Sequence, residues 1–204
     1  MIALIDYRAG NLTSVRKALA FIGAEAGTPA TPDDLKDAAG IIVPGVGHFG
    51  ATAALDESWR EAVRRSLSQG RPLLGICLGL QWLFEGSEEA PALPGLGVLQ
   101  GHCARLREKG DSPLFPLKVP HVGWNSLDRC GSSRLLEGVL SGTQAYFTHS
   151  YVAPRSGATV AETTHGEAFP SVVERDLVFG AQFHPEKSGD AGLRILRNFM
   201  ALCA

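Results

Sequence analysis

Gly75-Ile76-Cys77-Leu78-Gly79 is the stretch that decides the fold of this chain. It places one cysteine between two glycines, directly after the apolar run Pro72-Leu73-Leu74. This pattern is typical of a nucleophile elbow, in which a buried strand stops abruptly, the nucleophile occupies a strained turn and a helix begins beneath it. The glycines are needed because neighbouring backbone passes close to such a turn. We therefore expect a strand that ends at Cys77.

A helix is expected to follow the elbow, because Leu80, Leu83 and Phe84 have helical apolar spacing. The positive end of the helix dipole would favour a thiolate on Cys77, which is the nucleophilic form of cysteine. By itself the motif leaves a second interpretation open, since free cysteines are commonly small buried apolar residues.

A partner for Cys77 stands far downstream, in Gly180-Ala181-Gln182-Phe183-His184-Pro185-Glu186. This segment follows the apolar strand pattern Leu177-Val178-Phe179. In an extended segment residues two apart point to the same side, so His184 and Glu186 are expected to meet. The carboxylate would fix the imidazole tautomer and stabilise its protonated form. Together with Cys77 these residues predict a catalytic triad.

A second glycine-containing loop is expected beside the sulfur. Gly45, Val46 and Gly47 follow the predicted strand Gly40–Val43, and ligand sites of open α/β sheets lie beyond the carboxyl ends of the strands. We predict that backbone N–H groups of this loop, together with that of Leu78, form an oxyanion hole.

Composition restricts the possible functions. The chain has 204 residues, 45% apolar and 20% charged, with a formal net charge of −2, and this charge gives no argument for binding nucleic acid or an anionic membrane. Its first apolar residues reach Asp6 too soon for a signal peptide or a membrane span. The four cysteines lack zinc-ligand spacing, so we expect no metal site, no disulfide framework and a cytoplasmic location.

The order of the predicted elements indicates one domain over residues 1–204. Strands and helices alternate in the first half, which favours a parallel sheet covered by helices, and the second half is rich in β-patterns. The expected strands are 2–6, 40–43 and 73–76, with β-rich stretches at 97–106, 144–152, 158–162, 170–173 and 177–183; the expected helices are 11–21, 57–69 and 193–202.

These motifs resemble the class I, triad-type, glutamine amidotransferases, which pair G-x-C-x-G with a late H-P-E. Within them the chain is most similar to the glutaminase subunits of imidazole glycerol phosphate synthase. Four segments carry the resemblance: Ile5-Asp6-Tyr7-Arg8-Ala9-Gly10-Asn11, Pro44-Gly45-Val46-Gly47, Pro120-His121-Val122-Gly123-Trp124-Asn125 and Phe183-His184-Pro185-Glu186-Lys187-Ser188. The resemblance spans nearly the whole chain.

The resemblance implies a three-layer, flavodoxin-like mixed α/β sheet with helices on both faces and an antiparallel extension. It implies hydrolysis of glutamine to glutamate and ammonia through a γ-glutamyl thioester on Cys77, with no metal or organic cofactor. It also implies that glutamine is bound by Gln81, His149, Ser150 and Tyr151, for which surface and packing roles are the other interpretation.

The resemblance further implies a separate partner, a (β/α)8-barrel cyclase subunit that uses the ammonia to make imidazole glycerol phosphate and the carboxamide ribonucleotide of purine synthesis (AICAR). The residues expected to face this partner are Tyr7, Asn11, Trp124, Asn125 and Lys187. A core position for Trp124 and a solvated position for Lys187 are the other interpretations.

A dinucleotide-binding protein is a rival interpretation, because Gly45-Val46-Gly47-His48-Phe49-Gly50 fits G-x-G-x-x-G after a strand. The fingerprint normally opens the first βα unit and is followed by an acidic residue. Here it lies in a later unit, and the corresponding region Arg64-Arg65-Ser66 is basic.

Two further interpretations keep the fold. A cysteine peptidase or another hydrolase would use the same triad roles, and the elbow alone does not exclude it. A non-catalytic interaction module would need no triad, so the presence of Cys77, His184 and Glu186 argues against it.

Overall fold

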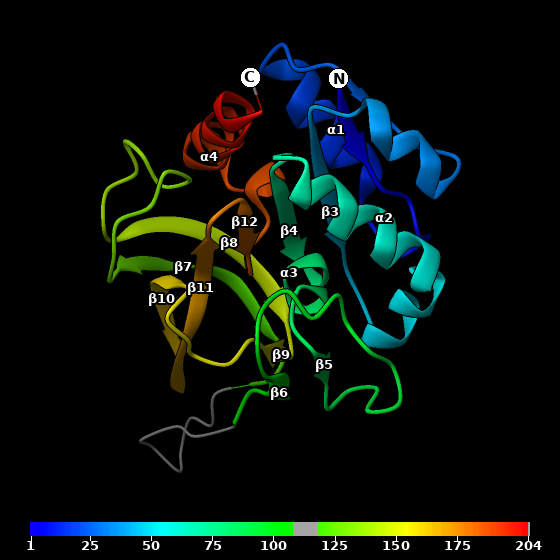
Figure 1. The fold of residues 1–204 in the computed structure, drawn as a ribbon. Helices are drawn as coiled ribbons and strands as arrows, with labels where there is room; N and C mark the ends of the chain where they lie inside the picture. The colour runs from blue at the N-terminus through cyan, green and yellow to red at the C-terminus, as the bar shows by residue number, and fades with distance from the viewer. Residues whose placement is uncertain (108–117, 204) are drawn as a thin grey trace.

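The structure is a computed structural model that describes residues 1–107 and 118–203. Within them nine strands form one sheet in the order β2-β1-β3-β4-β12-β11-β10-β7-β8 (Figure 1). The strands are β1 (Ile2–Leu4), β2 (Ala26–Gly27), β3 (Gly40–Gly45), β4 (Leu73–Cys77), β7 (His121–Arg129), β8 (Thr143–His149), β10 (Thr159–His165), β11 (Glu167–Arg175) and β12 (Val178–Ala181). From β2 to β12 the neighbours are parallel, and from β12 to β8 they are antiparallel. The predicted mixed sheet with an antiparallel extension is confirmed.

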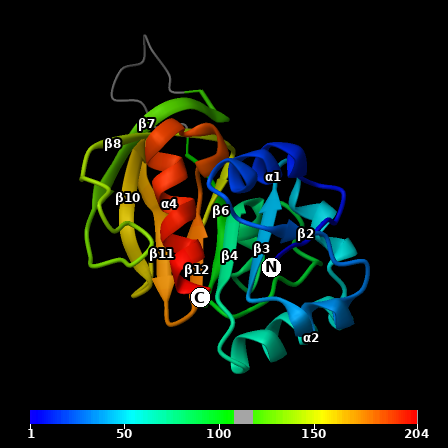
Figure 2. The same ribbon diagram turned by 90° about the horizontal axis from the view of Figure 1, so that it is seen from above.

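Helices cover both faces of the parallel half (Figure 2). Buried residues of α1 (Leu12–Phe21) and α4 (Gly189–Leu202) pack on one face, and those of α2 (Glu57–Ser68) and α3 (Leu78–Trp82) pack on the other. Short 3₁₀ helices are η1 (Pro32–Asp37), η2 (Phe49–Ala54) and η3 (Pro185–Lys187), and a small second sheet contains β5 (Gly86–Ser87), β6 (His102–Arg105) and β9 (Tyr151–Val152). The predicted three-layer arrangement is therefore present.

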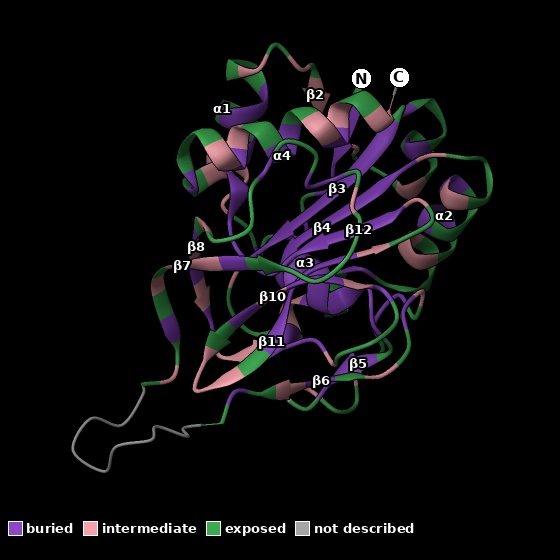
Figure 3. Ribbon diagram, turned by 90° about the vertical axis from the view of Figure 1, so that its left-hand side faces the viewer, coloured by how far each residue is buried: buried purple, intermediate pink, exposed green. Residues whose placement is uncertain are grey.

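The central strands are buried along their whole length. β3 and β4 carry no exposed residue, and Figure 3 shows them together with β12 in the colour of buried residues. Strands covered on both faces read as continuous apolar runs rather than alternating ones. This is why their positions could be predicted from sequence.

Three expectations about the elements were incomplete. The strand β7 was not predicted, because its nine residues include glycine and several polar side chains and most of them are not buried. The closing helix begins at Gly189, four residues before the predicted 193, since Gly189 and Asp190 give no apolar signal. The helix after the elbow ends at Trp82, so Leu83 and Phe84 lie beyond it although both are buried.

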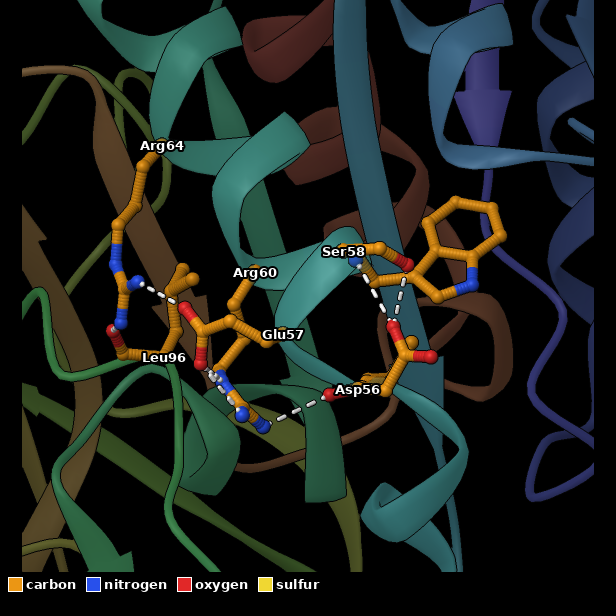
Figure 4. Close-up of polar contacts among 8 residues, drawn as sticks. Asp56, Glu57, Ser58, Arg60, Arg64 and Leu96 are labelled. Carbon is orange, nitrogen blue, oxygen red and sulfur yellow. Dashed lines mark hydrogen bonds and ion pairs between the residues drawn. The ribbon is translucent and has the colours of Figure 1, made fainter.

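Polar contacts fix the start of α2 (Figure 4). Asp56 is its N-cap, and its Oδ1 accepts hydrogen bonds from the Trp59 N–H at 3.2 Å and the Ser58 hydroxyl at 2.5 Å. Such caps satisfy backbone donors that have no partner inside the helix. Arg64 pairs with Glu57 at 3.0 Å and donates to the Leu96 carbonyl at 2.8 Å, which ties the helix to the segment between β5 and β6.

The elbow at Cys77 is strained in the way that the motif predicts. Cys77 has φ 53° and ψ −105°, a backbone conformation that side-chain-bearing residues rarely adopt. A Cβ atom on Gly79 would lie 1.8 Å from the Val43 carbonyl oxygen, and one on Gly75 would lie 2.5 Å from the Gly79 carbonyl oxygen. Both glycines are therefore required by close approach of the backbone.

We expect Gly79→Ala to lower the free energy of unfolding by about 3 kcal/mol, because the new methyl group meets backbone of β3 that has no room to move. Gly157→Ala is the matched control, since no atom lies within 4 Å of its Cβ position, and it should change stability by less than about 0.5 kcal/mol. Urea unfolding of both variants measures this. Equal stability of the two would show that the elbow tolerates a side chain.

Candidate active site

Cys77 lies at the carboxyl end of β4, where the chain turns into α3. It is 3% exposed, and its Sγ lies 3.7 Å from the Thr148 carbonyl oxygen of β8. The Gln182 side-chain amide donates to the same sulfur at 3.8 Å. Three segments far apart in sequence therefore converge on one thiol.

His184 and Glu186 form a buried pair. The His184 Nδ1 lies 2.8 Å from the Glu186 Oε1, and each side chain is 1% exposed. The predicted contact is present, but the prediction that an extended segment produces it is wrong. Pro185 begins the 3₁₀ helix η3, and this tight turn brings the carboxylate back to the imidazole.

The second ring nitrogen of His184 is available for chemistry. Nε2 is buried and forms no hydrogen bond of ordinary geometry with the described residues, although the Cys77 sulfur is near enough to affect the pKa of the ring. Burial lowers the pKa of His184, but the negative charge of Cys77, a contact with its sulfur and the Glu186 carboxylate outweigh that effect and raise the pKa to about 10. The neighbouring Cys77 and Glu186 thus favour the protonated form of the imidazole.

The helix dipole contributes less than the sequence suggested. α3 is only five residues long, so few peptide dipoles add up at its N-terminus. His184 is a nearby group that can interact with the sulfur when its ring is protonated.

A pocket of about 220 Å³ opens beside Cys77. Its lining contains the four residues predicted to bind the substrate and two of the four predicted to form the oxyanion hole. The lining residues are Gly47, Cys77, Leu78, Gln81, Glu89, Pro120, Thr148, His149, Ser150 and Tyr151. The volume suits a small ligand such as an amino acid.

Glu89 is a pocket residue that the sequence analysis missed. It is the one acidic side chain in the described lining, and its Oε2 accepts a hydrogen bond from the Phe49 N–H at 2.6 Å. It follows Glu88 in an irregular segment, so neither periodicity nor motif marks it out. A carboxylate at this point can bind a cationic group.

The loop at 44–47 does not present the predicted donor of Val46 to the pocket. The Val46 N–H donates to the Ala9 carbonyl at 2.6 Å. Gly45 and Val46 do not line the pocket, whereas Gly47 and Leu78 do. In this arrangement the Val46 N–H is bonded to Ala9 and is not free to act as the predicted oxyanion donor.

The predicted surface position of Tyr7 is wrong. Tyr7 is 4% exposed, and its hydroxyl oxygen would lie 1.9 Å from a Cβ on Gly45. Burial and the charge of Cys77 raise the pKa of Tyr7 above its usual range. Its place is therefore beneath the 44–47 loop, close to the sulfur.

The other predicted partner-facing residues are accessible to different degrees. Trp124 is 56% exposed, so it is not a core residue, and its ring meets that of Tyr146 edge-on at 6.1 Å. The Lys187 ammonium lies 5.7 Å from the centre of the same Tyr146 ring. Asn11, the N-cap of α1, and Asn125 are half-buried.

Other classes of site find little support in residues 1–107 and 118–203. They contain no group of three or more His, Cys, Asp or Glu residues arranged to hold a metal ion. None of the helices described there has the length and apolar character needed to cross a bilayer. The G-x-G-x-x-G segment leads into the 3₁₀ helix η2 rather than an α-helix that could hold a pyrophosphate at its N-terminus.

The family of the chain follows from comparison with known proteins. A family model described as glutamine amidotransferase class-I matches residues 3–203. The chain therefore belongs to the class-I glutamine amidotransferases.

Individual relatives define the family more closely. A protein of Desulfovibrio desulfuricans named imidazole glycerol phosphate synthase subunit HisH is 46% identical, with 100% of this chain and 95% of the relative covered. One of Thermococcus kodakarensis with the same name is 44% identical, with 99% and 100% covered. Within the class, the chain belongs to the family of these HisH subunits.

Solved structures agree with the fold. A structure described as a glutamine amidotransferase superposes with a TM-score of 0.74 at 22% identity, covering 99% of this chain and 98% of that one. PurLQS from Thermotoga maritima gives a TM-score of 0.75 at 20% identity, with 98% and 97% covered. At these identities the likeness concerns the fold alone.

We expect Cys77→Ala to lower the pKa of His184 below the value of about 10. The substitution removes the charge and the contact of Cys77 that raise this pKa, while burial continues to disfavour the charged ring. NMR titration of the imidazole nitrogens measures the pKa, with Cys130→Ala as the control because Cys130 is an exposed free cysteine. An unchanged pKa would mean that His184 and Cys77 are not coupled.

Proposed function

We propose that this chain is the glutaminase subunit of an imidazole glycerol phosphate synthase, and that Cys77, His184 and Glu186 are its catalytic triad. The observation that carries the proposal is the pocket in which Cys77 meets all four predicted glutamine-binding residues, with the buried His184–Glu186 pair behind the sulfur. Family membership identifies the class of reaction.

The first half of the reaction breaks the carboxamide bond of glutamine. The Cys77 thiolate attacks the side-chain carbonyl carbon, and the negative charge that develops on the carbonyl oxygen is stabilised by backbone N–H groups. His184 then gives its Nε2 proton to the departing nitrogen, so ammonia leaves and a γ-glutamyl thioester remains. Glu186 stabilises the imidazolium throughout.

The second half releases glutamate. His184, now neutral, takes a proton from a water molecule that attacks the thioester, and it returns this proton to the Cys77 sulfur as the C–S bond breaks. The cycle needs no metal or organic cofactor, because acid-base and nucleophilic groups supply each step.

We assign the α-amino and α-carboxylate groups of glutamine to the part of the pocket that lies away from Cys77. Glu89 is placed to bind the α-ammonium group, since it is the acidic residue of the described lining. Gln81, His149, Ser150 and Tyr151 surround the rest of the substrate. This polar set favours a free amino acid over the peptide chain that a cysteine peptidase would require.

Ammonia needs a second active site. In bulk water at neutral pH it is mostly ammonium, which is not nucleophilic, so direct transfer to a partner preserves its reactivity. We assign the partner as a (β/α)8-barrel cyclase subunit that makes imidazole glycerol phosphate and AICAR.

The exposed Trp124 is proposed to contact this partner, because aromatic anchors are enriched in interfaces. Asn11, Asn125 and Lys187 are proposed to contact it as well. The four free cysteines are consistent with the reducing cytoplasm as its location.

We expect the chain to release glutamate from glutamine when the cyclase barrel and its nucleotide ligand are present, and Cys77→Ala to lower this rate by at least about a thousandfold because the nucleophile is gone. A coupled glutamate assay measures it. Cys130→Ala, which removes an exposed thiol, should keep the native rate. Absence of glutamate under every condition would favour another hydrolase with the same triad.

We also propose that the 44–47 loop gates activity. The Val46 N–H is bonded to Ala9, and rotation of the peptide between Gly45 and Val46 would direct it towards the pocket. Partner binding is proposed to favour the rotated state, so that glutamine is not hydrolysed when ammonia cannot be used. Val46 carries a β-branched side chain, which makes unusual φ values costly.

Val46→Gly is therefore expected to raise glutaminase activity without the partner by about fivefold, because glycine lowers the cost of the rotation by roughly 1 kcal/mol. The ratio of rates with and without the loaded cyclase measures the effect. Val46→Ala is the matched control, since it loses bulk but keeps a Cβ atom. If the native protein alone hydrolysed glutamine as fast as its complex with the ligand-bound cyclase, the gating proposal would be wrong.

A further inference from the structure

A network of hydrogen bonds, buried except at the half-buried Asn125 and Tyr151, links strand β7 to the proposed glutamine pocket. The Asn125 Nδ2 lies 3.3 Å from the His121 Nε2, and the His121 Nδ1 lies 3.2 Å from the His149 Nε2. The His149 Nδ1 in turn lies 3.1 Å from the Tyr151 carbonyl oxygen. His149 and Tyr151 line the pocket, whereas His121 and Asn125 do not.

The donor and acceptor of each hydrogen bond in this network follow from the groups at its two ends, the Asn125 amide and the Tyr151 carbonyl. Asn125 Nδ2 also donates to the Thr164 carbonyl at 3.0 Å, and Asn125 Oδ1 accepts from the Ser126 N–H at 2.8 Å, which fixes the orientation of the amide. Nδ2 can only donate, so the His121 Nε2 accepts and the His121 proton is on Nδ1.

The same reasoning fixes His149. Because the His121 Nδ1 donates, the His149 Nε2 accepts and the His149 proton is also on Nδ1. That proton points to the Tyr151 carbonyl, which can only accept. The Asn125 end and the Tyr151 end of the network therefore require the same tautomer, with Nδ1 protonated in each ring.

The two rings remain neutral in this environment. Burial, with the nearby His165 ring, lowers the pKa of His121 to about 4, and burial, with the neighbouring His121 ring, lowers the pKa of His149 to about 3. His121 is held between the Phe147 ring at 4.8 Å and the His165 ring at 4.2 Å. A neutral, wedged imidazole has a fixed position and a fixed tautomer.

The network of hydrogen bonds continues from Tyr151 to the Cys77 sulfur. The Tyr151 carbonyl also accepts from the Gln81 Nε2 at 2.9 Å, and this nitrogen lies 3.5 Å from the Gln182 Oε1. The Gln182 amide donates to the Cys77 sulfur at 3.8 Å. Gln81 and Gln182 are 4% and 0% exposed, and burial of this kind strengthens hydrogen bonds.

We propose that His121 is a positioning residue for the glutaminase reaction: by donating to His149 it holds the tautomer of that ring, and through Tyr151 and Gln81 it sets the geometry of the glutamine pocket. The inference rests on the proposed function of the site. His121 touches neither the substrate pocket nor the sulfur, and it acts through His149 alone.

The tautomers are measured first, by NMR correlation of ring protons with both imidazole nitrogens in the native chain. The signals that disappear from the spectrum of the His149→Gln variant are those of the His149 ring. The expected result is a protonated Nδ1 and an unprotonated Nε2 for both His121 and His149. A His149 ring protonated on Nε2 overturns the proposal without any His121 variant.

Kinetics then test the functional consequence in the complex with the cyclase. His121→Phe keeps an aromatic ring between Phe147 and His165 but removes the donor. It should raise KM for glutamine about tenfold, the loss of roughly one buried hydrogen bond, and change kcat less than about threefold because the triad is untouched. His121→Asn retains an N–H group near the Nδ1 position and should restore KM to within about threefold of native.

His165→Phe is the matched control. It keeps the stacked ring on the outer side of His121 and leaves the bond to His149 in place, so KM should stay native. A native KM in His121→Phe, or equal losses in His121→Phe and His121→Asn with both folded, overturns the positioning role. If the native protein released no glutamate, the proposed glutaminase function would be wrong. The NMR measurement would still show whether His149 has the predicted tautomer.

Discussion

The strained turn at Cys77 is the constraint on which the rest of the site depends. Its left-handed backbone requires glycine on both sides, because β3 and α3 pass within contact distance of positions 75 and 79. In return the cysteine is presented at the end of a strand that is buried along its whole length. Strain of this kind persists only when surrounding packing fixes it, and here the sheet and its covering helices provide that packing.

Around this turn the protein holds three buried histidines in two opposite electrostatic states. The pKa of His184 is raised because Cys77 and the Glu186 carboxylate outweigh the effect of burial. The pKa values of His121 and His149 are lowered by burial and by neighbouring imidazoles. The same side chain therefore has its protonated form favoured in one position and its neutral form favoured in two others. Such opposite shifts are what the proposed acid-base role of His184 and the proposed positioning role of His121 require.

Much of the fold could be predicted from local pattern. Apolar runs at β3, β4 and β12 located the central strands, and the elbow motif located the strand end that carries Cys77. The strand β7 could not be located in this way, because it is only partly covered and its sequence alternates weakly. The H-x-E contact was predicted correctly for the wrong reason, since a 3₁₀ turn rather than an extended strand creates it.

The sequence by itself determined the family and supplied the residues of the proposed triad: a cysteine on an elbow and a late histidine with a nearby carboxylate. Only the tertiary structure decided that Tyr7 is buried, that the Val46 N–H is bonded to Ala9, that Glu89 lines the pocket and that His121 reaches His149. Nearly all these facts depend on contacts between residues tens of positions apart in the chain. Such contacts are set by strand order, register and the packing of layers, which a local pattern of residues does not encode.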